Sequence, residues 1–264
     1  MKICCLVKEV PDAAVQKRLD PATKRLDRSG EKTLNQFDTH GIEAAMQIRE
    51  GGAVEVDEIV AVTMGPDSAQ RALHKAVALG ADRSVHLSDD ALAGSDVCAT
   101  GYALAKVLES ESPDLVLLGQ QSDDGECYTI GAVVADHLQM PSLTQVIKID
   151  VTDGKLRCER QAEYGYDTVE VELPAVISVG DAINEPRYPS LKAIMGAKKK
   201  PLDTKSAADA GIEADRVGYD NARAHCSDFA APPAKEAGRI IEDEDTGETV
   251  QQIVAWLDER KLLA

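Results

Sequence analysis

A polar loop near the middle of the chain carries the residue types best suited to hold a ligand. It follows the apolar run LVLLG, which ends at Gly119, and it contains Asp123, Asp124 and Glu126 before apolar residues resume at Ile130. A strand that leads through a loop into a helix leaves unpaired N–H groups at the helix N-terminus, and these groups bind phosphate. The acids would then cap the helix or bind a ribose hydroxyl. The pattern is typical of a nucleotide site built from main-chain groups, and a capped surface loop without a ligand fits it equally well.

Two further segments are expected beside this loop. The first apolar run of the chain ends at residues 6–8, and the second ends at residues 63–65. In an open parallel sheet the ligand crevice lies beyond the carboxyl ends of the strands, where these segments would meet. The chain contains neither G-x-G-x-x-G nor G-x-x-x-x-G-K-[ST], so the sequence predicts no dinucleotide fingerprint and no P-loop.

The other reactive side chains form no catalytic or metal-binding pattern. The five histidines are scattered, and the 46 acids single out no carboxylate pair. The six cysteines include no C-x-x-C, and the adjacent Cys4 and Cys5 would point to opposite faces of a strand. We therefore expect no catalytic residue and no metal, and we interpret the cysteines as reduced and buried. Cys127 is the exception to examine, because it lies in the polar loop.

Composition excludes several classes of partner. The chain has 264 residues and a formal net charge of −17, which argues against nucleic acid or an anionic membrane as the main partner. No apolar run reaches the roughly 18 residues that a membrane span needs. The start MKICCLVKEVPD is interrupted by Lys8 and indicates a first strand rather than a signal peptide. We expect a protein of the cytoplasm, or of the mitochondrial matrix in a eukaryote.

The first 150 residues alternate between apolar strands and amphipathic helices. The expected strands are residues 2–10, 58–64, 84–87, 114–119 and 143–149, and the expected helices are residues 39–49, 65–79, 96–108 and a stretch from about 130. This alternation predicts a Rossmann-like α/β fold of the adenine-nucleotide-binding type, with a mostly parallel sheet and helices on both faces.

The pattern changes after residue 150. Residues 155–161 and 168–173 are expected to pair as a hairpin excursion, and residues 174–179 to form another apolar strand. From about residue 201 to residue 236 the sequence has little periodicity, and this stretch is too long for an ordinary loop. A last amphipathic helix is predicted over residues 246–262, with the apolar positions Val250, Ile253, Val254 and Leu257. The predicted domains are therefore an α/β domain over residues 1–200 and an extended arm over residues 201–264 that docks its helix elsewhere.

The segment NEPRYPSLKAIMGAKKKPL, residues 184–202, combines apolar and basic side chains. Leu191, Ile194 and Met195 precede three consecutive lysines. On so acidic a chain, exposed apolar residues beside a basic cluster indicate contact with another protein. The alternative is a solvated lysine run that complements the dipole at the end of a helix.

Several stretches together carry a family resemblance. They are LVKEVPD, LNQFD at residues 34–38, VTMGP at 62–66, ALGADR at 78–83, LVLLGQQSDDGE, LPAVISV at 173–179 and NEPRY with the lysines after it. In this order they resemble the beta subunit of electron transfer flavoprotein over residues 1 to about 200. Tyr164 and Asp167 depart from the family preference for a small or acidic residue and for Glu or Gln at those positions.

The resemblance implies a heterodimer. In that family the arm embraces an alpha subunit, and the two subunits share an FAD that carries electrons between flavin-dependent dehydrogenases and an electron-accepting oxidoreductase. The segment over residues 183–200 would be a recognition loop for partner dehydrogenases, with Leu191 as anchor beside Ile194 and Met195. The beta subunit also buries a nucleotide of its own. Carried over by position, that pocket comprises Leu6, Asn35, Gln36, Phe37, Asp38, Met64, Gly119, Gln120, Gln121, Ser122, Asp123, Asp124, Gly125, Glu126, Cys127, Tyr128, Thr129 and Ile130.

The resemblance also bears on the identity of this second nucleotide. Members that bind AMP have Asn-Gln-Thr before the glycine at the helix start, whereas this chain has Tyr128, Thr129 and Ile130 before Gly131. Members with a second FAD tend to carry Asp-Gly-Asp earlier in the loop and an aliphatic residue before that glycine. The chain has Asp-Gly-Glu and Ile130, which favours FAD slightly over AMP. A second FAD would permit electron bifurcation.

Two classes of protein remain as alternatives. A nucleotide sensor of the universal-stress type shares the fold, but it would lack the NEPRY segment and the arm. An adenylyl transferase would carry a phosphate-loop or HIGH-like motif, which we do not find in this sequence.

Overall fold

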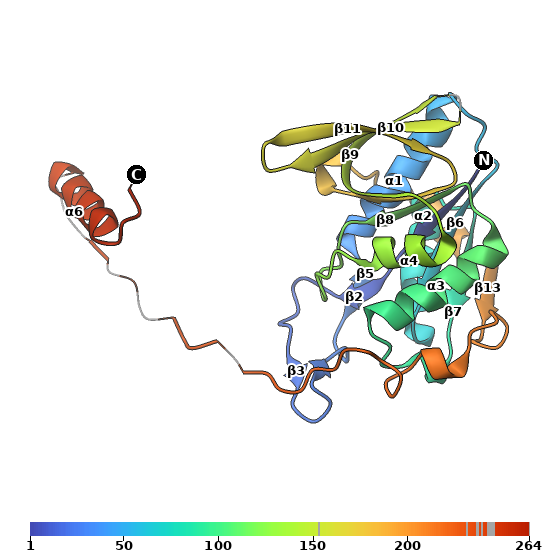
Figure 1. The fold of residues 1–264 in the computed structure, drawn as a ribbon, viewed down its shortest axis with the longest axis horizontal. Helices are drawn as coiled ribbons and strands as arrows, with labels where there is room; N and C mark the ends of the chain where they lie inside the picture. The colour runs from blue at the N-terminus through green and yellow to red at the C-terminus, as the bar shows by residue number, and fades with distance from the viewer. Residues whose placement is uncertain (153, 231, 236–237, 239, 242–245, 264) are drawn as a thin grey trace. The chain divides into compact units, whose positions relative to one another are not determined.

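A central sheet organises the first of two compact units (Figure 1). The computed structural model describes residues 1–152, 154–230, 232–235, 238, 240–241 and 246–263. Met1–Ser227 form the first unit and Asp228–Ala264 the second. Over the described residues the sheet has nine strands, in the order β11 (Gly165–Glu172), β10 (Lys155–Ala162), β9 (Ser142–Thr152), β12 (Ala175–Val179), β8 (Leu115–Gly119), β1 (Lys2–Leu6), β6 (Glu58–Met64), β7 (Arg83–Leu87) and β13 (Leu202–Lys205).

Most of the sheet is parallel. Every pairing along β9-β12-β8-β1-β6-β7-β13 is parallel, as uninterrupted apolar runs such as LVLL predict. β10 and β11 pair antiparallel and extend the sheet beyond β9 as a hairpin. The predicted α/β fold, with a mostly parallel sheet and a hairpin excursion, is therefore confirmed.

Helices cover both faces of this sheet (Figure 1). One face packs against α1 (Gln36–Gly51), α2 (Gln70–Leu79) and α5 (Leu191–Ala197), and the other against α3 (Val97–Glu111) and α4 (Ile130–Leu138). Cys5 belongs to the same core cluster as Ile42 of α1, on one face of the sheet. Its neighbour Cys4 belongs to the same core cluster as Leu108 of α3, on the other face. Short 3-10 turns lie at η1 (Asp67–Ala69), η2 (Asp90–Leu92), η3 (Asp181–Ile183) and η4 (Ala214–Arg216).

The cysteines follow the prediction in part. All are free, and Cys4, Cys5 and Cys158 are buried. Cys127, the exception singled out from the sequence, and Cys226 are exposed, so the interpretation of the thiols as buried is wrong for Cys226. Their exposure follows from their positions, since both lie in polar segments outside the helices and strands.

The first strand is shorter than the predicted residues 2–10. The N–H of Lys8 donates to the carboxylate of Asp38 at 2.8 Å instead of to a neighbouring strand, and β1 ends at Leu6. The chain then makes an excursion that the sequence did not predict. It consists of β2 (Glu9–Pro11) paired antiparallel with β5 (Lys32–Leu34), and between them the small hairpin of β3 (Leu19–Asp20) and β4 (Arg25–Leu26).

The predicted domain boundary at residue 200 differs from the structure. β13 adds to the edge of the sheet beside β7, although its sequence LDTK has no apolar run. Residues beyond it also bond to the first unit: Glu213 N–H donates to the hydroxyl of Tyr102 at 3.2 Å, and Gly218 N–H to Ser95 Oγ at 2.8 Å. The first unit therefore continues to Ser227.

The second unit contains the predicted terminal helix, α6 (Thr246–Glu259). Its apolar residues Val250, Ile253, Val254 and Trp256 are exposed. None of the described helices combines the length and apolar character that a membrane crossing requires.

A first prediction concerns the close packing of α3 on α4. A Cβ at Gly101 would lie 2.9 Å from Cβ of Val133 and still closer to its Cγ1. We expect Gly101→Ala to lower the free energy of unfolding by up to about 2 kcal/mol, because overpacking costs about 1–3 kcal/mol and the gain in helix propensity offsets only about 1 kcal/mol of it. Denaturant unfolding measures the change.

Gly196 provides the matched control for this substitution. It also lies in a helix, but a Cβ there would meet no atom within 4 Å, so Gly196→Ala should be neutral or stabilising. The double variant Gly101→Ala, Val133→Ala should recover part of the loss at Gly101. Equal effects of the two glycine substitutions would contradict the packing explanation.

Candidate functional site

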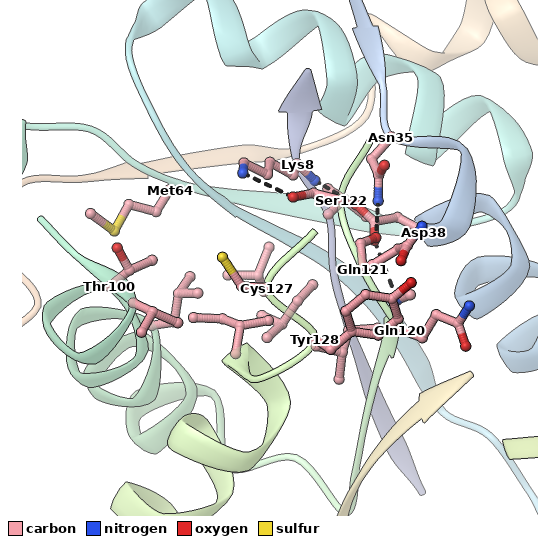
Figure 2. Close-up of a pocket in the computed structure, with 18 of the residues that line it drawn as sticks. Lys8, Asn35, Asp38, Met64, Thr100, Gln120, Gln121, Ser122, Cys127 and Tyr128 are labelled. Atoms are coloured by element: carbon pink, nitrogen blue, oxygen red, sulfur yellow. Dashed lines mark hydrogen bonds between the residues drawn. The ribbon is translucent and has the colours of Figure 1, made fainter. Parts of the chain in front are cut away.

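A cavity of about 280 Å³ lies at the carboxyl ends of β1, β6 and β8 (Figure 2). Its walls come from segments far apart in the sequence: the ends of these strands, the starts of α1 and α3, and the loop between β8 and α4. The lining residues are Leu6, Val7, Lys8, Asn35, Asp38, Val62, Met64, Ser95, Asp96, Val97, Thr100, Leu104, Leu118, Gly119, Gln120, Gln121, Ser122, Cys127, Tyr128 and Ile130. This is the position at which open parallel sheets bind ligands.

The structure brings many of the predicted nucleotide residues together at this cavity. Those that line it are Leu6, Asn35, Asp38, Met64, Gly119, Gln120, Gln121, Ser122, Cys127, Tyr128 and Ile130. Those that do not line it are Gln36, Phe37, Asp123, Asp124, Gly125, Glu126 and Thr129. Several of the second group instead hold the surrounding loops in place.

Asp38 joins three walls of the cavity. Its carboxylate accepts hydrogen bonds from the N–H of Lys8 at 2.8 Å and from the N–H of Gly119 at 3.3 Å. Burial raises the pKa of the Asp38 carboxyl from 3.8 to about 7, although hydrogen bonds from Asn35, Lys8 and Gly119 act in the opposite direction. One side chain therefore holds the ends of β1 and β8 against the start of α1.

Asn35 holds the loop that follows β8. Its Nδ2 donates to the main-chain oxygen of Gln121 at 2.8 Å, and its Oδ1 accepts from the N–H of Asp123 at 3.0 Å (Figure 2 shows the first bond). The carboxylate of Asp123 accepts from the N–H of Gln36 at 3.5 Å. Asp123 thus faces the start of α1, and neither it nor Gln36 reaches the cavity.

Gly119 lets α1 approach the end of β8. A Cβ at this position would lie 2.5 Å from the carbonyl carbon of Phe37 and 2.8 Å from the main-chain nitrogen of Asp38. These are backbone atoms, so only glycine fits here. The group that approaches this glycine is therefore the chain itself and not a ligand.

Asp124 does not line the cavity and instead forms ion pairs. Its carboxylate lies 2.8 Å from Nζ of Lys8 and also pairs with Arg28. Burial would raise the pKa of this carboxyl, but Lys8, Ser122 and Arg28 outweigh burial and hold the pKa at about 2. Nζ of Lys8 also donates to Ser122 Oγ at 3.2 Å (Figure 2). The cations therefore tie the loop to β1 and to the excursion.

The loop ends at the N-terminus of α4 beside the cavity. Tyr128 adopts a left-handed φ of 58°, and Thr129, the N-cap residue, makes no side-chain cap hydrogen bond. The first N–H groups of α4, from Ile130 on, remain available to an anion. The buried Oε1 of Gln121 has no hydrogen-bond partner among the described residues. Main-chain donors beside an unpaired acceptor fit the phosphate and the polar edges of a nucleotide.

The start of α3 forms a wall that the sequence analysis missed. Ser95, Asp96, Val97, Thr100 and Leu104 all line the cavity there. Ser-Asp before an apolar helix is an N-cap pattern, and the Asp96 carboxylate does accept from the N–H three residues on, at 2.9 Å. Because this helix follows a parallel strand, its N-terminus could have been placed at the same edge of the sheet.

No metal centre accompanies the cavity in the described part of the chain, where no group of three or more His, Cys, Asp or Glu side chains could hold a metal ion. The charged groups at the cavity are engaged with protein atoms: Lys8 with Asp124, Asp38 with two main-chain N–H groups, and Asp96 with the start of α3. Their arrangement suits binding by main-chain and amide groups.

Comparison with known proteins decides the family. Residues 23–210 match the family described as electron transfer flavoprotein domain. The chain is 41% identical to the electron transfer flavoprotein subunit beta of Mycobacterium tuberculosis over 99% of each chain, and 36% identical to that of Thermoanaerobacterium thermosaccharolyticum over the full length of both. It is 33% identical, again over both full lengths, to subunit CarD of the caffeyl-CoA reductase–Etf complex of Acetobacterium woodii.

The chain belongs to the electron transfer flavoprotein beta-subunit family. The role of the chain is therefore in electron transfer. The family binds flavin or nucleotide, and a beta subunit implies an alpha subunit as its partner.

The predicted partner-recognition residues of this electron transfer flavoprotein subunit share one short helix, α5. Leu191 is 74% exposed and Met195 69% exposed, and Ile194 is also exposed. Ser190 caps the helix, with its Oγ accepting from the N–H of Ala193 at 3.2 Å. The apolar side chains thus lie on an ordered, capped helix.

A second prediction concerns Asp38 in the electron transfer flavoprotein chain. The folded protein keeps the Asp38 carboxyl protonated between its ordinary pKa of 3.8 and about 7, whereas the unfolded chain releases that proton. The contribution of Asp38 to stability should therefore fall as pH rises through this range, by at most about 1.4 kcal/mol per pH unit. Urea unfolding of wild type and Asp38→Asn between pH 4.5 and 8 checks this. Asp38→Asn should flatten the slope, and identical slopes would contradict the assignment.

Proposed function

We propose that the chain is the beta subunit of a heterodimeric electron transfer flavoprotein that shares an FAD with an alpha subunit. The complex passes electrons between flavin-dependent dehydrogenases and an electron-accepting oxidoreductase, in the cytoplasm or, in a eukaryote, in the mitochondrial matrix. One observation carries the proposal: a member of this family keeps a nucleotide-sized cavity at the carboxyl ends of β1, β6 and β8.

A second nucleotide occupies that cavity in this proposal. Its phosphate binds the free N–H groups at the start of α4, beginning at Ile130. The unpaired Oε1 of Gln121 accepts a hydrogen bond from its ribose or base, and the ring of Tyr128 packs on a planar group. Asp38 and Asn35 do not need to touch the nucleotide, since both hold the walls around it.

FAD and AMP are the two candidates for this nucleotide, and we propose FAD. The aliphatic Ile130 lines the cavity at the position before Gly131, where AMP-binding members carry a hydroxyl. A cavity of about 280 Å³ is just below the range of about 300–1,000 Å³ for small-molecule sites. This volume supports AMP as the alternative, or FAD with its flavin end outside the cavity. A second FAD would allow bifurcation, and one relative is named as part of a caffeyl-CoA reductase–Etf complex.

The chain contributes binding and positioning rather than redox chemistry. A bound flavin supplies the one-electron chemistry. The loop between β8 and α4 is held by Asn35, Lys8 and Arg28, so it is ordered before a ligand arrives. Such preorganisation reduces the entropy that binding must remove.

Two exposed apolar surfaces are assigned to protein partners. The helix α5 docks a flavin-dependent dehydrogenase through Leu191, and α6 docks the alpha subunit through its exposed stripe. Apolar side chains of this size are rarely left in water over a whole helix face without a partner.

The third prediction tests the cofactors. The full-length chain is co-expressed with an alpha subunit of the same family, purified gently in excess FAD, and denatured for nucleotide analysis. We expect two FAD per heterodimer and no AMP. One FAD and one AMP would reject the second flavin in favour of the AMP alternative. A chain that binds no alpha subunit and carries a nucleotide alone would support the nucleotide-sensor class instead.

The fourth prediction concerns Leu191. An apolar anchor in a partner pocket is worth about 2 kcal/mol, so Leu191→Ala should raise the KM of the heterodimer for a dehydrogenase about 20–30-fold. Flavin content and thermal unfolding should stay as in wild type. Leu19→Ala, at an exposed leucine in β3, is the control and should leave the KM unchanged. An unaltered KM with Leu191→Ala for every partner tested removes α5 from the proposal.

A further inference from the structure

The segment before α5 is fastened to α1 by side chains rather than by a sheet. Nδ2 of Asn184 donates to the main-chain oxygen of His40 at 3.0 Å, and Nδ1 of His40 lies 3.1 Å from Oδ1 of Asn184. Both contacts join residues far apart in the sequence. They place the NEPRY motif along the middle of α1.

Arg187 makes the strongest of these attachments. Its Nε donates to Glu43 at 2.7 Å and its Nη2 to the same carboxylate at 3.0 Å. The guanidinium also bonds to Glu50 at 2.7 Å and 2.9 Å. Its main-chain N–H reaches Glu43 as well, at 3.2 Å. Paired bonds of this kind fix orientation as well as distance, because the guanidinium and the carboxylates are planar.

The two glutamates are spaced to receive one guanidinium. Glu43 and Glu50 are seven residues apart, so they lie on one face of α1. Glu43 is buried and Glu50 is exposed. The guanidinium of Arg187, which bonds to both, therefore joins the interior to the surface. These carboxylates raise the pKa of Arg187 above its usual value, with Glu50 as the larger cause, and the guanidinium stays charged.

The far end of α5 has its own attachment. Ala197 is buried in the core cluster with α2, and Nζ of Lys200 donates to the main-chain oxygen of Ala81 at 2.9 Å. Between Arg187 and Ala197 the exposed side chains have no comparable support: Tyr188 is 95% exposed and Leu191 is 74% exposed. The orientation of the apolar face of α5 therefore depends on what holds its start.

We propose that Arg187 is a positioning residue that, through Glu43 and Glu50, holds α5 in one orientation so that Leu191, Ile194 and Met195 meet a partner together. This inference rests on the proposed function for its partner, but not for the position of α5. A lysine cannot replace the arginine in this role, because one ammonium cannot bond to both carboxylates in fork geometry.

Two variants test the proposal in the full-length heterodimer. Arg187→Lys keeps a cation beside the buried Glu43 and loses the fork. The double variant Arg187→Met, Glu43→Gln removes the cation together with the buried charge, so no uncompensated carboxylate threatens folding. Arg49→Met is the matched control, because Arg49 also joins α1 to a carboxylate, that of Asp82, but does not touch the segment before α5.

Hydrogen exchange and kinetics provide independent readouts. In both Arg187 variants, amides of residues 188–197 should exchange about tenfold faster, while those of α1 keep their rates. The KM for a dehydrogenase that reduces the wild-type heterodimer should rise about tenfold with an unchanged kcat, because a loosened docking helix must be ordered on binding. Arg49→Met should change neither readout, although it lowers stability.

The outcomes separate this inference from the proposed function. Unchanged exchange over residues 188–197 in both Arg187 variants overturns the positioning role. Faster exchange with an unchanged KM, in a protein whose KM does respond to Leu191→Ala, also overturns the proposed effect on docking. If Leu191→Ala has no effect, α5 is not the docking surface and that part of the proposed function fails, while the exchange rates still decide whether Arg187 positions α5.

Discussion

The buried carboxylate of Asp38 is the interaction on which the rest of the site depends. It accepts main-chain N–H groups from Lys8 and Gly119, and so it ties the ends of two adjacent parallel strands to the first turn of α1. Burial of a carboxylate is costly, and here the two N–H donors and Asn35 offset part of that cost. Because the N–H of Lys8 bonds to Asp38 and not to a strand, β1 ends at Leu6 and the chain is free to form the excursion.

The sequence predicts the parts of this arrangement that depend on long apolar patterns. The runs LVLL and IVAV identify β8 and β6, and α4 has the spacing of a half-buried helix. Strands of two to four residues, such as β3 and β13, carry no periodicity and are defined only by pairing, β3 with the nearby β4 and β13 with the distant β7. The sequence also does not show where a side chain points. Asp124 looks like a residue that binds a ligand, but it pairs with Lys8 and Arg28, which are about 100 residues away in the sequence.

The helix α1 connects the cavity to the proposed docking surface. Asp38 and Asn35 lie at its start, beside the cavity, while Glu43 and Glu50 hold Arg187 further along. At a rise of about 1.5 Å per residue, Glu43 and Glu50 lie about 8 Å and about 18 Å along the helix from Asp38, on one rigid element. A nucleotide site and a partner site built on one helix keep a constant separation, and electron transfer between bound flavins depends on distance. The same helix therefore serves both proposed sites through two buried carboxylates, Asp38 and Glu43.

An acidic loop beside the proposed phosphate site looks contradictory in a chain of net charge −17, and the partners of the acids resolve the contradiction. Asp124 stays ionised because Lys8 and Arg28 hold its pKa near 2, and in return it neutralises those cations. Asp123 faces the start of α1, where the helix dipole favours a negative charge. Neither carboxylate lines the cavity, and the cations that pair with Asp124 offset its repulsion of an anion bound there. The acids stabilise the shape of the loop, and the uncapped start of α4 is left to meet the phosphate.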